Sequence, residues 1–218
     1  IASRQGLPMI PALAETVAIA KYLLIIEATK VRAHFGLLSC GASVELIKIA
    51  KDKGLPVTAD VAMHQLHLTE SLTDGFNSLA HVRPPLRAEK DKLLLRQGVK
   101  DGVIDAICTH HEPLSSSAKL APFAETQPGM TAFDTYVAFG IQLVNEGLFE
   151  PLEWVEKVTL APAKVANMVD RWTEESGWAL VDPKLEWTVS KDSILSQGKN
   201  TPLIHQKVVG KVVQIFVT

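Results

Sequence analysis

Apolar residues recur along the chain with two spacings, one typical of helices and one typical of strands. A helix of about five turns is predicted after Ile10-Pro11, because proline suits an early helical position and one apolar face is formed by Leu13, Val17, Ala20 and Leu24. Further helices are predicted between Ser43 and Gly54 and at 88–100, 131–146, 151–158 and 162–169. Short apolar or β-branched runs predict strands at 31–38, 56–61, 80–83 and 103–108.

The order of these elements indicates the fold class. Strands alternate with helices through short connections, which is typical of an α/β fold with a parallel sheet and helical crossovers. From Gly177 onward, apolar residues alternate in twos without intervening helices, which predicts a small β subdomain. We therefore expect an α/β domain at 1–172 and a β subdomain at 173–218.

Composition narrows the class of protein. The 218 residues are 47% hydrophobic and 21% charged, with a formal net charge of −2 and no long run of either sign, so nucleic acid and membrane surfaces are not expected partners. The longest apolar run, Tyr22–Ile26, is too short to span a bilayer, and no cleavable signal pattern opens the chain, so a cytoplasmic location is expected. Cys40 and Cys108 are expected to be reduced thiols.

Adjacent ionisable residues follow the last predicted strand of the α/β part. The run Cys108-Thr109-His110-His111-Glu112-Pro113-Leu114 lies at a strand end, where parallel folds gather their functional side chains. Neighbouring residues at a strand end point apart, so we do not expect His110 and His111 to share a metal. His64 and His67 are expected at the surface or in a loop.

Several separate stretches together resemble the C-terminal half of a dihydroorotase of the amidohydrolase superfamily, closest to its non-catalytic, dihydroorotase-like members. The similar stretches, in order, are Gly6-Leu7-Pro8-Met9-Ile10-Pro11, Leu38-Ser39-Cys40-Gly41-Ala42-Ser43, Arg83-Pro84-Pro85-Leu86-Arg87 and Lys199-Asn200-Thr201-Pro202. The resemblance implies the last four strands, the fifth to eighth, of a (β/α)₈ barrel, followed by a small β-sandwich subdomain. It also implies that the N-terminal half of the barrel is a partner of this segment, which looks like a fragment because its sheet would have two open edges.

The resemblance further implies zinc chemistry, for which zinc needs nitrogen, thiolate or carboxylate ligands. At the matching positions this sequence has Leu37 for a ligating histidine, Gln65 for a second histidine, His110 for a metal-binding aspartate and Leu114 for a substrate-binding histidine. His34 is not expected to replace the ligand lost at Leu37, because residues three apart on a strand point to opposite faces. We therefore expect no catalytic residues and no cofactor.

An anion-binding remnant is also implied by the resemblance. Arg83 matches an arginine that binds the substrate carboxylate, and Gly129 matches a backbone contact to the same substrate. An alternative for Arg83 is an ion pair with a carboxylate such as Asp60, and the sequence leaves both open.

The resemblance implies a pseudoenzyme that assembles with the catalytic subunit of aspartate transcarbamoylase in pyrimidine biosynthesis, and we expect a homo-oligomer. The alternative is an active zinc-dependent dihydroorotase, or a related cyclic amidohydrolase, with His110 in an altered ligand set. A third possibility, an independent binding module made of this segment alone, is disfavoured by the open sheet edges.

Overall fold

A computed structural model describes residues 2–171 and 177–217 of the chain. The expected boundary between residues 172 and 173 lies outside these described residues. The α-helices are α1 (Ala2–Gln5), α2 (Ala12–Thr29), α3 (Gly41–Asp52), α4 (Glu89–Lys100), α5 (Phe133–Asn145), α6 (Pro151–Val158) and α7 (Leu160–Val165). The strands are β1 (Ala33–Phe35), β2 (Val57–Ala62), β3 (Ala106–Cys108), β4 (Trp178–Thr188) and β5 (Lys207–Phe216). Short 3₁₀ helices are η1 (Met63–Leu66), η2 (Glu70–Phe76), η3 (Ser78–Ala80), η4 (Ser116–Lys119), η5 (Phe123–Glu125) and η6 (Val169–Arg171).

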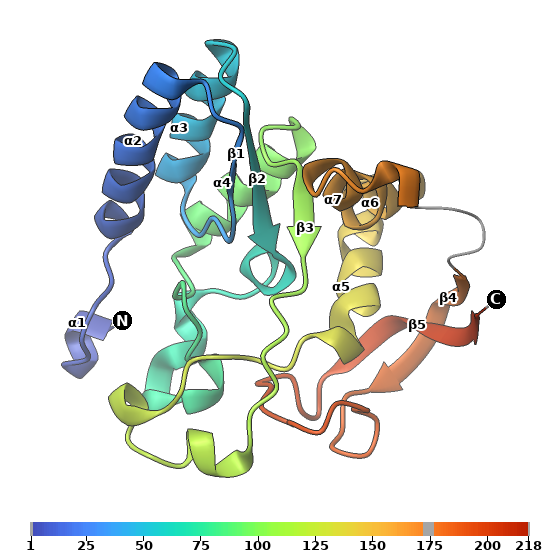
Figure 1. The fold of residues 1–218 in the computed structure, drawn as a ribbon. Helices are drawn as coiled ribbons and strands as arrows, with labels where there is room; N and C mark the ends of the chain where they lie inside the picture. The colour runs from blue at the N-terminus through green and yellow to red at the C-terminus, as the bar shows by residue number, and fades with distance from the viewer. Residues whose placement is uncertain (1, 172–176, 218) are drawn as a thin grey trace.

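The first sheet of the described chain is parallel, in the order β1-β2-β3. Strands β2 and β3 point the same way in Figure 1, so the carboxyl ends of the sheet share one edge. The expected strand at 80–83 is wrong, because β2 pairs directly with β3. This segment is instead held by loop contacts, since the Gly129 N–H donates to the His81 carbonyl at 2.9 Å. The α/β class is confirmed, with three strands in place of the four expected in this part of the chain.

Helices cover one face of the sheet and enclose the core. Alternation along β2 turns Ala59 and Val61 into a cluster with residues of α3, α4 and α5, including Ile47, Leu95 and Phe139. The opposite face of β2 carries Thr58 and Asp60, which are only partly buried. Thr58 and Asp60 therefore lie on the face of the sheet that points away from α3, α4 and α5.

Helix α2 has the expected length but buries a different face. The expected face is largely exposed, with Leu13 67%, Val17 58% and Leu24 69% exposed, whereas Ile19 and Ile26 are the buried residues. The prediction was wrong because α2 is apolar on both sides, so spacing alone does not choose the face that packs. A second apolar stripe of α2 is left in solvent.

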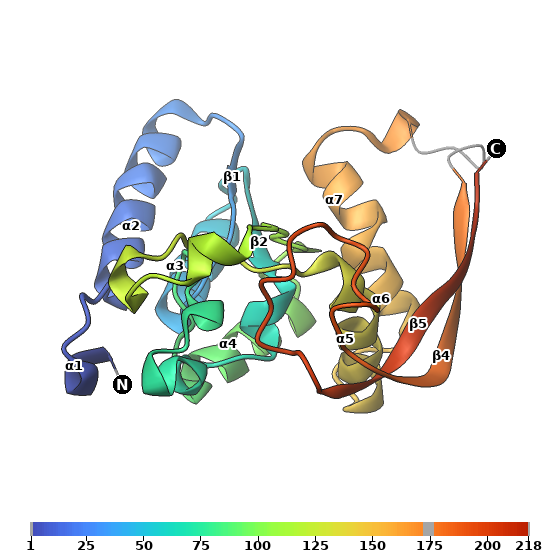
Figure 2. The same ribbon diagram turned by 90° about the horizontal axis from the view of Figure 1, so that it is seen from below.

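The C-terminal part contains a two-stranded antiparallel ribbon, β4 with β5, that lies beside α5 in Figures 1 and 2. The approach is close: a Cβ atom on Gly210 of β5, whose φ is +96°, would lie 2.8 Å from the Ile141 side chain of α5. The segment between the strands returns to the main core, where Val189, Ile194 and Leu203 are buried. The C-terminal residues thus complete the core of the α/β part.

Candidate functional site at the strand ends

Three segments meet where the parallel strands end. Leu37 follows β1, His64 lies in η1 directly after β2, and His110 follows β3. Because the strands are parallel and adjacent, these positions share one edge of the sheet. This is the edge at which the sequence placed the candidate chemistry.

His110 packs on His64 at this edge. The two ring centroids are 5.3 Å apart and the rings are nearly parallel, with an angle of 27° between their planes. His64 is 1% exposed, so its expected surface position was wrong. Burial, with a smaller contribution from the neighbouring His110, lowers the pKa of His64 to about 3. His64 is therefore a neutral side chain at ordinary pH.

Few hydrogen bonds hold this pair. Both ring nitrogens of His64 and the Nδ1 atom of His110 are buried without a hydrogen-bond partner among the described residues. The other nitrogen of His110, Nε2, lies 3.6 Å from a carboxylate oxygen of Glu112. In the part of the chain that the structure describes, no group of three or more histidine, cysteine or acidic side chains is placed to hold a metal ion. The described residues alone therefore do not supply the three or four ligands that hold zinc.

His111 points to a different partner from His110. Its Nδ1 atom accepts hydrogen bonds from the backbone N–H groups of Ala132 and Phe133, both at 3.1 Å, at the start of α5. These bonds require Nδ1 to be unprotonated, and burial lowers the pKa of His111. His111 thus caps the N-terminus of α5, whereas His110 stacks on His64, so the two adjacent side chains have different partners.

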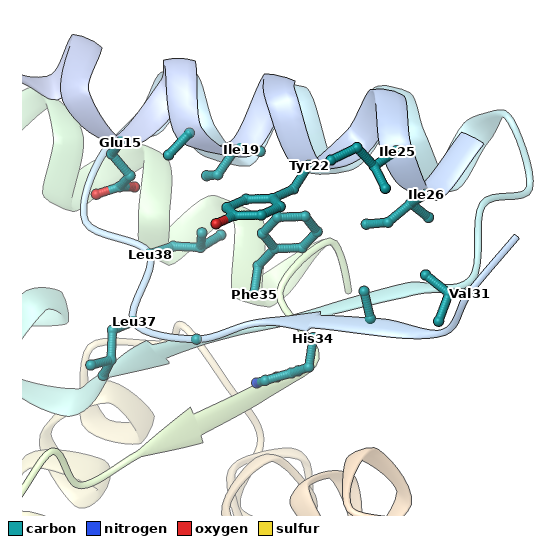
Figure 3. A pocket seen from close by; sticks show the side chains of 13 residues that line it. Glu15, Ile19, Tyr22, Ile25, Ile26, Val31, His34, Phe35, Leu37 and Leu38 are labelled. Carbon is teal, nitrogen blue, oxygen red and sulfur yellow. The ribbon is translucent and has the colours of Figure 1, made fainter. Parts of the chain in front are cut away.

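His34 and Leu37 both lie beside Asp60. The His34 Nε2 atom is 2.8 Å from Asp60 Oδ2, and the Leu37 N–H donates to Asp60 Oδ1 at 2.8 Å. Figure 3 shows both side chains on the same side of β1, so the expectation that they point to opposite faces was wrong. The alternation of a strand does not extend to Leu37, because β1 ends at Phe35 and Leu37 has a φ of +61°.

Asp60 links the three strands. It also accepts a hydrogen bond from the Cys108 thiol at 3.4 Å, and His34 makes a second bond to Thr58 at 2.9 Å. Burial raises the pKa of Asp60, but the hydrogen bonds from His34, Leu37 and Cys108 outweigh it and the pKa is lowered. Burial and the Asp60 charge raise the pKa of the Cys108 thiol, so Cys108 is not activated as a nucleophile.

Gln65 of η1 contacts the loop that carries Arg83. Gln65 is 2% exposed, and its side-chain N–H₂ donates to the carbonyls of Pro84 and Pro85, both at 3.2 Å. Gln65 therefore orders the loop that carries Arg83. The Arg83 side chain is exposed and has no hydrogen bond or ion pair with any described residue, so it does not pair with Asp60.

Arg87, four residues further on, is in contrast closely held. Its Nε–H donates to Ser39 Oγ at 3.0 Å, and its guanidinium also bonds to the Ile10 carbonyl and lies 3.9 Å from Glu15. Glu15 accepts bonds from both the backbone N–H and the hydroxyl of Ser39. This cluster fixes the start of α2 against the loop after β1.

Asn200, which lies in one of the stretches that carry the resemblance, joins the loops around Leu114 and Gly129. Its side-chain oxygen accepts from the Leu114 N–H at 2.7 Å and from the Thr131 hydroxyl at 2.8 Å. Its N–H₂ group donates to the carbonyls of Glu112 at 3.0 Å and Gly129 at 3.1 Å. Asn200 is 3% exposed, so its amide is buried. The substrate contacts expected at Gly129 and Arg83 stay predictions.

The chain is similar in sequence to several known proteins. A "dihydroorotase-like protein" of Pseudomonas aeruginosa is 40% identical over 214 residues, which are 97% of this chain and 50% of that protein. The chain has dihydroorotases as homologues. The dihydroorotase of Syntrophus aciditrophicus is 34% identical over 220 residues, 100% of this chain and 52% of that protein. The chain thus spans about half the length of the curated relatives it matches, and no protein-family model matches it.

Solved structures show the same half-length match for this dihydroorotase homologue. A D-hydantoinase has a TM-score of 0.86 at 23% identity, covering 95% of this chain and 48% of that one. An inactive dihydroorotase-like domain of the Chaetomium thermophilum CAD-like multifunctional protein has a TM-score of 0.68 at 17% identity, covering 92% and 53%. The fold is therefore of the hydantoinase type, which is consistent with part of a TIM barrel and a small β unit. Among the described helices, none is both long and apolar enough to cross a membrane.

Proposed function

We propose that the protein is a cytoplasmic, dihydroorotase-like pseudoenzyme that binds the catalytic subunit of aspartate transcarbamoylase and supports its assembly or activity in pyrimidine biosynthesis. The observation that carries this proposal is the geometry of the strand ends, where Leu37 stands at the end of β1 and His110 packs flat on His64. Two similar proteins, one described as dihydroorotase-like and one as an inactive dihydroorotase-like domain, support the same function for this chain.

The chemical reason is the ligand set. Zinc is held by three or four nitrogen, thiolate or carboxylate ligands, and an aliphatic side chain at Leu37 offers no electron pair. His111 uses its Nδ1 atom on the N-terminus of α5, which removes it as a ligand through that atom. A barrel without a metal keeps its packed core and its surface, so assembly with a partner is the role these can still serve. We propose a homo-oligomer and no resident cofactor.

An active zinc-dependent dihydroorotase, or a related cyclic amidohydrolase, is the second candidate. It is favoured by one observation, the ring nitrogens of His64 and His110 that are buried without partners among the described residues. In this alternative His110 contributes one ligand, and further ligands come from the half of the relatives' length that this chain does not match.

Metal content and turnover separate the two candidates. We expect the full-length protein, which also contains the half that this chain does not match, to hold far less than one zinc per chain after equilibration with zinc and to show no opening of the dihydroorotate ring. The Syntrophus aciditrophicus dihydroorotase, treated in the same way, serves as the active control. Stoichiometric zinc together with turnover establishes the active enzyme in place of the pseudoenzyme.

The partner is tested by size-exclusion chromatography with and without the catalytic subunit of aspartate transcarbamoylase. We expect the two proteins to elute together and the transcarbamoylase activity of the complex to differ from that of the catalytic subunit alone. Separate elution at micromolar concentrations of both proteins counts against the partner, whatever the metal content is.

A further inference from the structure

The outer surface of helices α2 and α3 carries apolar side chains that the core does not use. On α2 these are Leu13, Val17, Ala20 and Leu24, at intervals of four, three and four residues, the spacing at which one helix packs against another. Leu13 is 67% exposed, Val17 58% and Leu24 69%, and Ile49 of α3 is 48% exposed. We call these five residues the outer apolar face.

The outer apolar face is separate from the free edge of β1. Side chains on the inner side of α2, including Ile19, Tyr22 and Ile26, point toward β1 in Figure 3. A helix has 3.6 residues per turn, so Leu24 lies on nearly the opposite side of α2 from Tyr22. A continuation of the sheet beyond β1 therefore leaves the outer apolar face in solvent.

Two contacts fix how α2 and α3 lie beside each other. In the first turn of α2, Glu15 accepts a hydrogen bond at 3.0 Å from the N–H of Ser39, which lies just before α3. At the other end, Lys53 directly after α3 lies 3.4 Å from the carboxylate of Glu27 in the last turn of α2. The two helices therefore run parallel and side by side, as Figure 1 shows.

The apolar residues border the seam between these two helices. Ala20 comes two turns before Glu27, and Ile49 comes one turn before Lys53. Each therefore lies on the same side of its helix as one member of the Glu27–Lys53 pair, which bridges the seam. The outer apolar face is thus one continuous surface built from both helices, and α2 forms an outer edge of the molecule in Figure 2.

Two charges of opposite sign flank the outer apolar face. Lys21 follows Ala20 on α2 and turns away from α3, whereas Glu45 lies one turn before Ile49 on α3, on the side away from α2. Both side chains are exposed, and neither forms an ion pair with a described residue. Because the helix ends are aligned at Glu15 and Glu27, Lys21 and Glu45 lie at nearly the same height along the two helices.

Other charges on this side of the molecule are already neutralised within the chain. Lys48 pairs with Asp52 at 2.6 Å, and Lys53 pairs with Glu27 at 3.4 Å. The surface therefore has an apolar middle, a positive border on α2 and a negative border on α3, and each border is complementary to the other.

A surface with this charge pattern is complementary to a second copy of itself. We propose that the outer apolar face binds a second copy of this protein about a twofold axis that runs along the helices. Lys21 of each copy then faces Glu45 of the other, and Leu24 of each faces Ile49 of the other. An axis across the helices would instead place Lys21 against Lys21 and Glu45 against Glu45, which like-charge repulsion disfavours. The proposal rests on the proposed function only in taking the protein as a homo-oligomer.

Charge reversal tests the pairing of Lys21 with Glu45. The self-association of the full-length protein is measured by sedimentation at low salt over a range of concentrations. We expect Lys21→Glu and Glu45→Lys each to weaken it about tenfold or more, because each brings like charges together. An equimolar mixture of these two variants should form heterodimers about as tight as the wild-type dimer, because every facing pair is then of opposite sign, and the double variant should recover in the same way.

The apolar middle is tested by Leu24→Glu, which should also weaken self-association about tenfold or more, because it brings a charge into the apolar contact. The matched control is Leu152→Glu. Leu152 lies on α6, outside the outer apolar face, and is 81% exposed, against 69% for Leu24, so its replacement should leave self-association unchanged. Circular dichroism of each variant verifies that the fold is kept, which the exposure of both leucines favours.

Several outcomes would overturn the proposal. A monomeric wild-type protein removes both this dimer and the proposed homo-oligomer. A dimer that Leu24→Glu leaves as tight as Leu152→Glu does assigns self-association to another surface, and the homo-oligomer then stands. If Lys21→Glu pairs with the wild type as tightly as the wild type pairs with itself, but not with Glu45→Lys, the axis runs across the helices. If Leu24→Glu abolishes binding of the transcarbamoylase and leaves self-association intact, the face belongs to that partner. Zinc content and turnover enter none of these measurements, so the proposal fails or holds independently of catalytic inactivity.

Discussion

His34 of β1 and Asp60 of β2 are joined by a contact of 2.8 Å between Nε2 and Oδ2. The same carboxylate receives the Leu37 N–H and the Cys108 thiol, so one side chain links all three parallel strands of the described sheet. His34 is therefore a strand histidine whose two ring nitrogens are both engaged within the sheet, by Asp60 and Thr58.

We expect Asp60→Ala to lower the free energy of unfolding by about 2 kcal/mol or more, because three partly buried donors lose their acceptor. Asp52→Ala is the matched control, since Asp52 makes one exposed pair with Lys48. It should change the free energy of unfolding by less than about 0.5 kcal/mol. Urea unfolding followed by circular dichroism measures both, and equal losses would refute the role of Asp60.

Asn200→Ala should lower the free energy of unfolding more than Asp60→Ala does. It removes four hydrogen bonds from a buried amide and leaves the Leu114 N–H without its acceptor, whereas the Thr131 hydroxyl keeps the Gly198 carbonyl, so we expect a loss of free energy of unfolding of about 3 kcal/mol or more. In Asn77→Ala a single bond to the Leu79 N–H is lost, and about 1 kcal/mol is expected. Thermal and urea unfolding measure the free energy of unfolding of the two variants. Equal losses would show that the Asn200 side chain does not hold the two loops together.

Arg83 and Arg87 lie four residues apart and should behave differently. Arg83→Ala should leave the free energy of unfolding within about 0.5 kcal/mol of the wild type, because the side chain is exposed and unpaired in the described chain. Arg87→Ala should cost about 2 kcal/mol or more, because Ser39, Ile10 and Glu15 lose a partly buried charged partner. Similar costs, measured by urea unfolding, would contradict the assignment.

The stability should depend on pH through His64, which is buried, and His67, which is partly buried. Burial lowers the pKa of His64 and of His67 to about 3, with the Arg96 charge contributing at His67. The unfolded chain binds these protons below its ordinary histidine pKa of about 6.5, so the free energy of unfolding should fall as the pH drops from 6.5 toward 3. Each histidine contributes at most about 1.4 kcal/mol per pH unit in that window, and its contribution is fully present above it.

Urea unfolding between pH 4.5 and 7 measures this slope. We expect His67→Phe, which can keep the stacking on Phe139, to have a flatter pH dependence than the wild type, whatever its absolute stability. The ring centroids of His67 and Phe139 are 4.2 Å apart, so a second aromatic ring suits the site. Parallel slopes for the two proteins would show that His67 does not titrate with unfolding.

Most helices and the parallel sheet could be predicted from the sequence. The regular spacing of apolar residues and the glycines that end helices are local signals, and tertiary packing did not override them. Gly54, expected to end α3 with a left-handed backbone, has a φ of +73°. The face of α2 was not predictable in the same way, since both of its sides are apolar and the choice depends on α3 and β1. The expected strand before Pro84 failed because its backbone bonds to a loop that is far away in sequence.

The position of the candidate residues after a strand was predicted, but the burial and the contacts of their side chains were not. The run that contains His110 and His111 does follow a strand, and the two side chains do point to different partners. The burial of His64 was missed, because η1 turns the chain inward immediately after β2, and local sequence carries no sign of that turn. The stretch around Asn200 carries part of the resemblance, but the bonds of its side chain were not predicted, because the same residue types occur in buried bridges and in exposed turns.

The buried amide of Asn200 also sets an order of events during synthesis. Its four partners lie between residues 112 and 131, so they leave the ribosome some seventy residues or more before Asn200 does. Until then the loops that carry Leu114 and Gly129 are joined by the hydrogen bond from the Glu112 N–H to the Met130 carbonyl but lack the four bonds of Asn200, which require a long chain closure. We therefore expect a nascent chain that stops short of residue 200 to hold these loops less firmly than the longer chain does.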